Sequence, residues 1–248
     1  MKRIITLVLA ALMVMSLFAF ATADETAVTT YEEFVAAEVD TEVTVETYVQ
    51  AKQGWWTDSN SGVSQASIYT QSEDGAYFLY NLPCSEEEYE ALVPGTKVRV
   101  TGYKAEWSGE VEIVDATFEI IEDAEPYVAE AEDVTELFGT DDLAAKINRF
   151  VAVKGATVAA SNDNGAPFLF KWDGSGSEGD DLYFNVTIGE NTYTFTVESY
   201  LCGPDTEVYK KVMSLGVGDV IDLEGFLYWY EGPQPHITNV VMPGEAAE

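Results

Sequence analysis

Polar and apolar residues alternate with a period of two along much of the chain, and this pattern predicts β-strands. The clearest run is 43–49, Val-Thr-Val-Glu-Thr-Tyr-Val, in which every second side chain is apolar over most of its length. The first half of the chain contains further extended segments at 66–70, 76–80, 97–101 and 111–118. Asp74-Gly75 precedes the third of these five strands and is typical of a hairpin turn.

A short helix is expected between the third and fourth strands. Ser85 and Glu88 form a capping-box pattern, in which each side chain can accept a hydrogen bond from the other's backbone N–H. Pro94-Gly95 ends this helix. A second short helix, 31–37, is predicted ahead of the first strand. The order is therefore three strands, a helix and two strands.

The second half of the chain repeats this order. A helical lead-in at 142–148 precedes a strand at 150–158, and Asp205-Thr206 begins a helix before the last two strands. Between them the pattern predicts strands at 168–172, 182–188 and 193–197, one extended segment more than in the first half.

Glycine spacing is the strongest sign that the halves are copies of one unit. Gly95, Gly102 and Gly109 follow one another at intervals of seven residues, and the second half keeps both intervals at Gly218, Gly225 and Gly232. Unrelated sheets would rarely share this spacing over two strands and their connecting loop.

Five strands with a helix between strands three and four resemble the OB fold, and the chain resembles tandem OB-type domains of exported bacterial proteins. The expected fold is mainly β, with two tandem OB-fold-like five-stranded barrels, each with a helix between strands 3 and 4. An immunoglobulin-type sandwich is the alternative, and the capped helix disfavours it. The expected division is a signal peptide 1–23, a first domain 24–121, an acidic linker 122–133, a second domain 134–243 and a tail 244–248.

The N-terminus is typical of a secretory leader. Lys2 and Arg3 precede an uncharged apolar run, 4–20, and Ala21-Thr22-Ala23 is a small-residue cleavage pattern. The run is short for a membrane span, so we expect cleavage, no span afterwards and a secreted, extracellular or periplasmic product. The type of cell envelope stays open.

Charge is the dominant feature of the composition. The whole chain has 12 basic and 44 acidic residues, a net charge of −32. Loss of the leader, with its two basic residues, makes this about −34. Such a field repels phosphate and keeps a protein soluble and monomeric. We therefore rank a glycan or protein ligand above nucleic acid and expect a monomer.

The aromatic loops contain the candidate ligand-binding residues. An OB barrel binds on strands two and three and on the loops that join strands one to two and four to five. Those loops place rings where sugars or bases stack; packing of the rings between the domains is the structural alternative. The predicted ligand-binding residues are Trp55, Trp56, Tyr103, Trp107, Tyr228, Trp229 and Tyr230.

Metal and catalytic signals are weak. Asp173, Ser175, Ser177 and Asp181 alternate like the ligands of a calcium loop, but the glycine and glutamate of the full motif are missing, so we expect at most weak calcium binding and no other cofactor. No nucleophile motif accompanies His236, the sole histidine, and we predict no catalytic residues.

These observations predict an exported, non-enzymatic binding or interaction protein that uses aromatic OB-barrel loops for an unidentified ligand. The alternative is a secreted carbohydrate-active or nucleolytic enzyme. Two questions stay open at this level: whether Cys84 and Cys202 form a disulfide, which would require the two domains to meet there, and whether the two domains act together.

Overall fold

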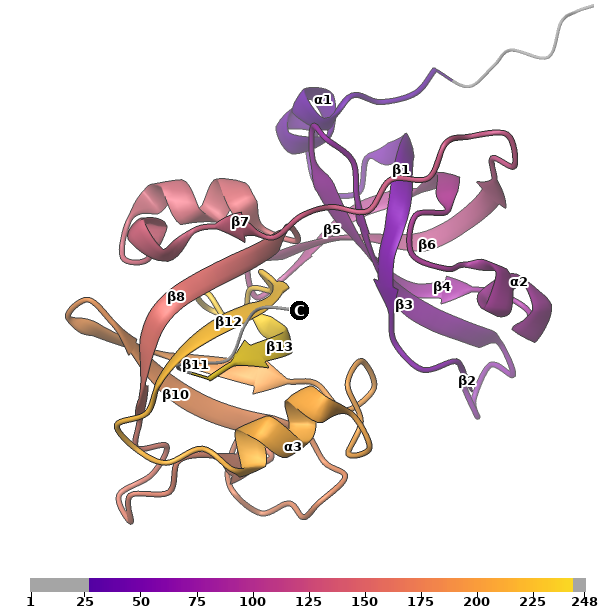
Figure 1. The fold of residues 1–248 in the computed structure, drawn as a ribbon. Coiled ribbons are helices and arrows are strands. Elements are labelled where there is room, and N and C mark those ends of the chain that lie inside the picture. Colours follow the sequence, from indigo (N-terminus) through magenta and orange to yellow (C-terminus); the bar gives the residue numbers. More distant parts are fainter. Residues whose placement is uncertain (1–26, 243–248) are drawn as a thin grey trace, which may run out of the picture.

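The computed structural model describes residues 27–242, and they form two closed five-stranded barrels in tandem (Figure 1). The predicted leader 1–23 and tail 244–248 lie outside the described residues. Within 27–242, no helix combines the length and hydrophobicity needed to cross a membrane.

The first barrel follows the predicted order of elements. Its sheet runs β1-β5-β6-β4-β3, and pairing of β1 with β3 closes it. Helix α1 precedes the first strand, and α2 lies between the third and fourth. The bounds are α1 (Tyr31–Ala36), β1 (Glu42–Lys52), β2 (Trp56–Thr57), β3 (Ser64–Gln71), β4 (Ala76–Pro83), α2 (Glu86–Ala91), β5 (Lys97–Trp107) and β6 (Glu110–Ile120).

The second barrel has the same topology. Its sheet runs β8-β12-β13-β11-β10, and pairing of β8 with β10 closes it. Helix α3 again follows the third barrel strand. The bounds are β7 (Glu132–Asp133), η1 (Thr135–Leu137), η2 (Asp141–Lys146), β8 (Phe150–Ala159), β9 (Leu169–Phe170), β10 (Leu182–Ile188), β11 (Asn191–Val197), α3 (Glu207–Met213), β12 (Val220–Phe226) and β13 (His236–Val241).

The expected fold is therefore confirmed, with two local corrections. The strand predicted at 168–172 is only the two-residue β9, and the first barrel has a matching short strand, β2, so neither half has an extra segment. The helical lead-in predicted at 142–148 is the shorter 3₁₀ helix η2, which ends at Lys146 because Ile147 has a non-helical ψ of 138° and Asn148 a positive φ of 68°.

The repeated glycines allow the strands of each barrel to cross closely. Gly102 and Gly225 both lie at irregularities in the strand register. A Cβ at Gly225 would lie 2.2 Å from the carbonyl O of His236, and one at Gly102 would lie 2.8 Å from the carbonyl O of Val114. These bulges bend the strands so that each sheet closes into a barrel.

Side chains cap the helices as the sequence predicts. The Ser85 hydroxyl accepts a hydrogen bond from the backbone N–H of Glu88 at 3.2 Å, and the Glu88 carboxylate accepts one from the N–H of Ser85 at 2.7 Å. Thr30 and Glu33 form the same box at α1. Lys104 closes the other end of α1, because its ammonium donates to the carbonyls of Phe34, Val35 and Ala37.

Each barrel has its own apolar core, and a third cluster joins the two. Tyr69 and Phe78 of the first barrel pack with Phe226 of the second, and all three are buried. The rings of Tyr69 and Phe226 are stacked, with centroids 4.3 Å apart and an interplanar angle of 9°. The two barrels are thus joined by a buried aromatic interface as well as by the linker.

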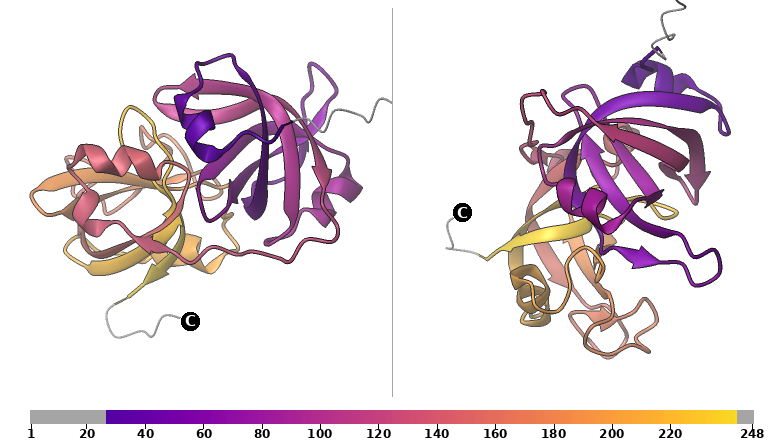
Figure 2. Two further views of the ribbon diagram at one scale, coloured as in Figure 1. Left: turned by 90° about the horizontal axis from the view of Figure 1, so that it is seen from above. Right: turned by 90° about the vertical axis from the view of Figure 1, so that its right-hand side faces the viewer.

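The acidic linker lies along the first barrel before it reaches the second, and Figure 2 shows it crossing between them. The amide of Gln50 holds it at two points, because Nε2 donates to the carbonyl of Tyr127 and Oε1 accepts from the N–H of Ala129. Its last two predicted residues form β7, which pairs with β8. The linker is therefore attached to both barrels.

Candidate functional site

A pocket of about 440 Å³ opens between the two barrels, and we call it the interdomain pocket. The second barrel provides most of its wall from β10, from the end of β11 and from the loop between β12 and β13. The first barrel contributes Trp107, at the end of β5. These are the strand-two, strand-three and four-to-five-loop positions of an OB barrel, where ligands of this fold bind.

Three exposed rings surround the opening, and we call them the aromatic mouth: Trp107, Trp172 and Tyr230. Their exposed fractions are 54%, 76% and 42%, which are unusual for side chains of this size. Trp107 and Tyr230 come from different barrels, and their ring centroids are 5.2 Å apart. The mouth therefore presents exposed ring surface, although Trp107 and Tyr230 also contact each other.

The base of the pocket is a buried stack of rings. Tyr228 lies over the imidazole of His236, with centroids 4.3 Å apart and an interplanar angle of 20°. The hydroxyl of Tyr69, from the first barrel, is 2.9 Å from Nδ1 of His236. Burial lowers the pKa of His236 to about 3, so the imidazole is neutral and serves as a packed, hydrogen-bonded ring.

Carboxyl groups line the inner wall. Glu198 is 9% exposed; its Oε1 accepts from the N–H of Tyr200, while Oε2 is covered from solvent and has no hydrogen-bond partner. Burial, followed by the charge of Asp181, raises the pKa of Glu198 to about 7. Thr196, two residues earlier on the same face of β11, also has an unpartnered buried hydroxyl. These polar atoms lack the partners that buried groups normally have.

Asp181 stands beside Glu198 and is oriented by Ser199, just after the end of β11. One of its oxygens, Oδ1, accepts both from the N–H of Ser199 at 2.8 Å and from the Ser199 hydroxyl at 2.6 Å. The wall residues include two carboxylates, Asp181 and Glu198, and no lysine or arginine. The pocket therefore combines stacking surface with hydrogen-bond acceptors in a negative field.

A second pair of buried carboxyls lies across the barrel interface. Glu110 is fully buried, and its Oε2 accepts from the backbone N–H of Trp229 at 2.8 Å. Burial raises the pKa of Glu110 to about 8 and that of Glu112 to about 7. The other oxygen of Glu110, Oε1, is covered from solvent and has no hydrogen-bond partner, and burial outweighs the pKa-lowering contacts with Trp229 and Asn148. Burial therefore favours the protonated, neutral form of Glu110.

The predicted ligand-binding residues separate into two groups. Trp107, Tyr228 and Tyr230 line the interdomain pocket. Trp229 lies beside it, partly buried against the core of the second barrel, with its ring over Gly109 of the first. Its packing matches the structural alternative that rings pack between the domains.

The remaining rings lie elsewhere on the first barrel. Trp55 donates from Nε1 to the carbonyl of Cys84 at 3.0 Å, Trp56 is exposed on β2, and the Tyr103 hydroxyl donates to Glu42 at 3.4 Å. None of these three lines the interdomain pocket. The structure therefore places one candidate site on the second barrel, closed by a ring from the first.

The sequence did not reveal the pocket's inner residues. Thr196 lies near the end of the predicted strand 193–197 and Glu198 directly follows that strand, so two polar residues two positions apart were the available signal. Asp181 was predicted as a weak calcium ligand, and His236 was given no ligand-binding role. Their convergence depends on contacts between residues far apart in the chain, such as Tyr69 with His236.

All four predicted calcium residues have hydrogen bonds within the fold: three in local turns and one to a residue 18 positions away. Asp173 accepts from the N–H of Ser175, Ser177 donates its N–H to Asp180, and Asp181 is bonded to Ser199. Among residues 27–242, no group of three or more His, Cys, Asp or Glu side chains is arranged to hold a metal ion. Weak calcium binding stays a prediction.

Cys84 and Cys202 are both buried and free in this structure, so the disulfide left open by the sequence is not formed. Burial raises the pKa of both thiols, that of Cys202 to about 11. Both groups are therefore neutral thiols in the ordinary pH range.

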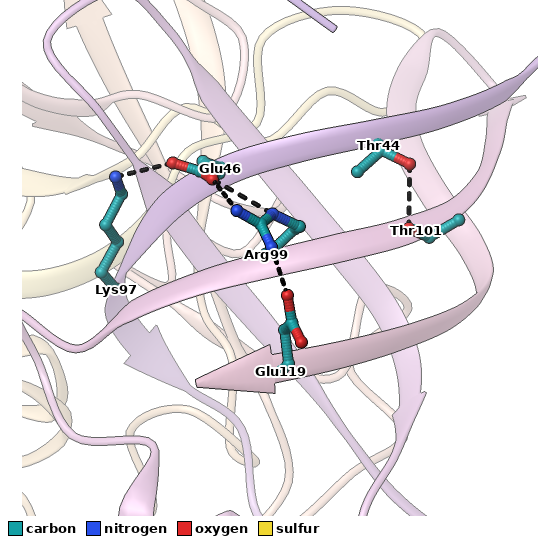
Figure 3. Close-up of polar contacts among 6 residues, drawn as sticks. All are labelled: Thr44, Glu46, Lys97, Arg99, Thr101 and Glu119. Atoms are coloured by element: carbon teal, nitrogen blue, oxygen red, sulfur yellow. Dashed lines mark hydrogen bonds and ion pairs between the residues drawn. The ribbon is translucent and has the colours of Figure 1, made fainter. Parts of the chain in front are cut away.

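Two basic side chains of the first barrel, Lys97 and Arg99, are paired with neighbouring carboxylates, as Figure 3 shows. On the outer surface of β1, β5 and β6, Glu46 bonds to both Lys97 and Arg99 at 2.7 Å, and Arg99 also bonds to Glu119. These cations are engaged within the fold and are not arranged as a row along a groove that could follow a phosphate backbone.

The architecture and the position of the pocket define the class: this is a tandem OB-fold protein with a pocket on the ligand face of its second barrel. No protein-family model matches the sequence, and no curated protein matches it.

Several solved structures align with most of the chain. A murine DNA-binding protein bound to double-stranded DNA aligns with 80% of this chain and 98% of its own, at 12% identity and a TM-score of 0.37. The p204 HINb domain aligns with 83% and 98%, at 12% identity and a TM-score of 0.36. The single-stranded-DNA-binding protein of Thermus aquaticus, as a deletion mutant, aligns with 84% and 96%, at 12% identity and a TM-score of 0.28. At these values the likeness extends to the fold only.

One expectation from the sequence has to be corrected. The sequence ranked a glycan or protein ligand above nucleic acid and predicted an exported binder of that kind, whereas the solved structures that align with the chain include DNA-binding proteins, one of them bound to double-stranded DNA. The ranking depended on net charge, and net charge describes the average field of a protein and not the chemistry of a particular pocket. The ranking and the function inferred from it are therefore withdrawn.

Proposed function

We propose that the protein binds a flat ring bearing N–H groups, of the nucleobase type, in the interdomain pocket. The ring stacks on the aromatic mouth, and its N–H groups donate to the acceptors inside. An unpaired nucleobase has this chemistry, because every base has a π-face and its edge carries amino or ring N–H donors. In this proposal the protein is a binding module, not an enzyme.

The observation that carries the proposal is the coincidence of two features in one pocket. Trp107 and Trp172 expose free ring faces at the opening, and Glu198 and Thr196 hold unpartnered polar atoms within. Exposed large rings favour a ligand that stacks, and buried acceptors without partners favour one that donates. A volume of about 440 Å³ accommodates a small ligand of this kind.

Charge determines which part of such a ligand is recognised. The chain has a net charge of −32, and the pocket wall adds two carboxylates without a lysine or arginine. Phosphate is therefore repelled, and recognition rests on the base and not on the backbone. A nucleoside should bind more tightly than its own 5′-monophosphate, and the difference should shrink as salt is added.

Titration of tryptophan fluorescence with adenosine, guanosine, cytidine and thymidine tests the proposal. We expect a saturable signal for at least one nucleoside, weakened by about 1–3 kcal/mol when Trp172 is replaced by alanine, the usual contribution of one stacked ring. Trp56→Ala is the matched control, because Trp56 is also exposed but lies outside the pocket.

Two results would overturn this function. One is the absence of saturable binding by all four nucleosides at millimolar concentration. The other is binding that Trp56→Ala weakens as much as Trp172→Ala does, which would place the ligand elsewhere on the protein.

A further inference from the structure

We propose that the interdomain pocket selects flat ligands whose N–H groups carry positive charge, such as an amidinium, a guanidinium or a protonated heterocycle, over neutral rings of the same shape. This inference rests on the proposed function in one respect, that ligands stack in this pocket. It goes further by stating which charge the ligand carries, because stacking alone does not distinguish a charged ring from a neutral one.

The inner wall provides the first argument. Glu198 is 91% buried and presents an oxygen without a partner, and Asp181 stands beside it with only Oδ1 engaged by Ser199. Two adjacent carboxyl groups with free acceptor positions match the paired N–H donors of an amidinium, which forms parallel hydrogen bonds to carboxylates. A buried carboxylate is costly unless such a partner is present.

The mouth provides the second argument. The faces of tryptophan and tyrosine rings carry negative potential and attract cations, tryptophan most strongly. Trp107 and Trp172 expose more than half of their surface at the opening, and Tyr230 stands beside Trp107. A flat cation gains from both stacking and this attraction, whereas a neutral ring gains from stacking alone.

The lining provides the third argument, because no lysine or arginine is among the residues that line the pocket. The ammonium of the neighbouring Lys171 lies 3.7 Å from a carboxylate oxygen of Asp180. The pocket wall therefore has negative groups and no positive group of its own, and a cationic ligand would provide the missing positive charge.

Three probes of nearly equal shape test the inference: benzamidine, benzamide and benzoate, which are cationic, neutral and anionic. Calorimetry on the full chain at about 0.15 M salt should show benzamidine binding at least tenfold more tightly than benzamide, and benzoate more weakly than either. Benzamidine should also displace any nucleoside that binds.

Variants locate the source of the preference. Glu198→Gln keeps the side-chain shape and should reduce the ratio of benzamidine to benzamide affinity at least fivefold, and Asp181→Asn should reduce it in the same direction. Glu190→Gln is the matched control, because Glu190 is exposed in the turn at the opposite end of the same strand pair. Thermal melts confirm that each variant is folded.

The outcomes separate the inference from the function it rests on. Equal affinity for benzamidine and benzamide, with nucleosides still bound through Trp172, would overturn the charge preference and leave the proposed function standing. A benzamidine preference that survives in both Glu198→Gln and Asp181→Asn would also overturn it. Failure of all three probes and of all nucleosides would overturn both.

Discussion

At the residue scale, Glu110 is the clearest case of chemistry set by burial. One carboxyl oxygen, Oε2, accepts from the N–H of Trp229, but the other, Oε1, is buried without a partner, so burial favours the protonated form. The folded state holds this proton up to about pH 8, since burial raises the pKa to about 8. An unfolded chain releases it near the ordinary value for glutamate, about 4.3.

The first prediction is that stability falls as pH rises from about 4.5 to 8, because the unfolded chain binds fewer protons than the native protein over this range. Glu110→Gln should raise the free energy of unfolding at pH 8 by about 1–3 kcal/mol and flatten this slope. Its amide can still accept from Trp229 and can donate to Asn148. Urea melts at pH 5 and pH 8 measure the effect.

Glu90→Gln is the control for that measurement, because Glu90 is exposed on α2. If Glu110→Gln and Glu90→Gln changed the pH dependence equally, the protonation of Glu110 in the folded state would be rejected.

The tryptophans provide the second prediction. Trp229→Ala should lower the free energy of unfolding by about 3 kcal/mol, because its ring packs against the second core and over Gly109. Trp172→Ala should change it by less than about 0.5 kcal/mol, because Trp172 is 76% exposed. Thermal melts measure both variants. Similar losses of stability in the two would contradict the conclusion that Trp229 belongs to the core and Trp172 to the exposed aromatic mouth.

The sequence predicted that these rings lie in ligand-binding loops, but it did not show which of them face the pocket and which pack against the core. Tyr228, Trp229 and Tyr230 are consecutive and equally aromatic, so composition cannot show which of them faces the pocket. The irregular loop between β12 and β13 has no period of two that would assign alternate residues to opposite faces. Only the packed structure distinguishes Trp229, against the core, from its two neighbours.

At the element scale, the repeated glycines explain why the fold was largely predictable. Alternation predicted the long strands, and a capping box predicted α2. The even spacing of Gly95, Gly102 and Gly109 with their counterparts predicted two copies. The signal was weak for β2 and β9, because a two-residue strand is too short to show any alternation.

The third prediction concerns the bulge in β12. Gly225→Ala should lower the free energy of unfolding by about 2–4 kcal/mol, because its methyl group would collide with the carbonyl of His236, a backbone atom that cannot move without breaking the strand pair. Gly54→Ala is the control, with its nearest such contact at an ordinary 3.8 Å. Denaturant unfolding compares the two variants. Equal losses in the free energy of unfolding would show that β12 and β13 do not approach each other closely at Gly225.

At the scale of the whole molecule, the sequence left the relation between the barrels open. The contacts that fix it, such as Tyr69 with His236, join residues separated by 167 positions, and no local pattern reports them. Net charge also gave a wrong ranking of ligand classes, because a value of −32 describes the protein's average field and not the composition of one pocket.

The fourth prediction follows from the shared aromatic cluster. Tyr69→Ala should destabilise the protein by about 3–5 kcal/mol, as expected for a fully buried ring, and should weaken both barrels because the ring contacts each. Hydrogen exchange would show faster opening of β3 and of β13 alike. Protection lost in only one barrel would mean that the barrels are energetically separate.

The stack of Tyr69 on Phe226 also has a kinetic consequence. Because a buried contact already fixes the two barrels on either side of the interdomain pocket, a ligand does not have to draw them together, and little ordering remains for the moment of binding. Association should then proceed in one step, with an observed rate that rises linearly with ligand concentration and shows no plateau from a slow closure. A loosened interface would turn the same pocket into a gated one.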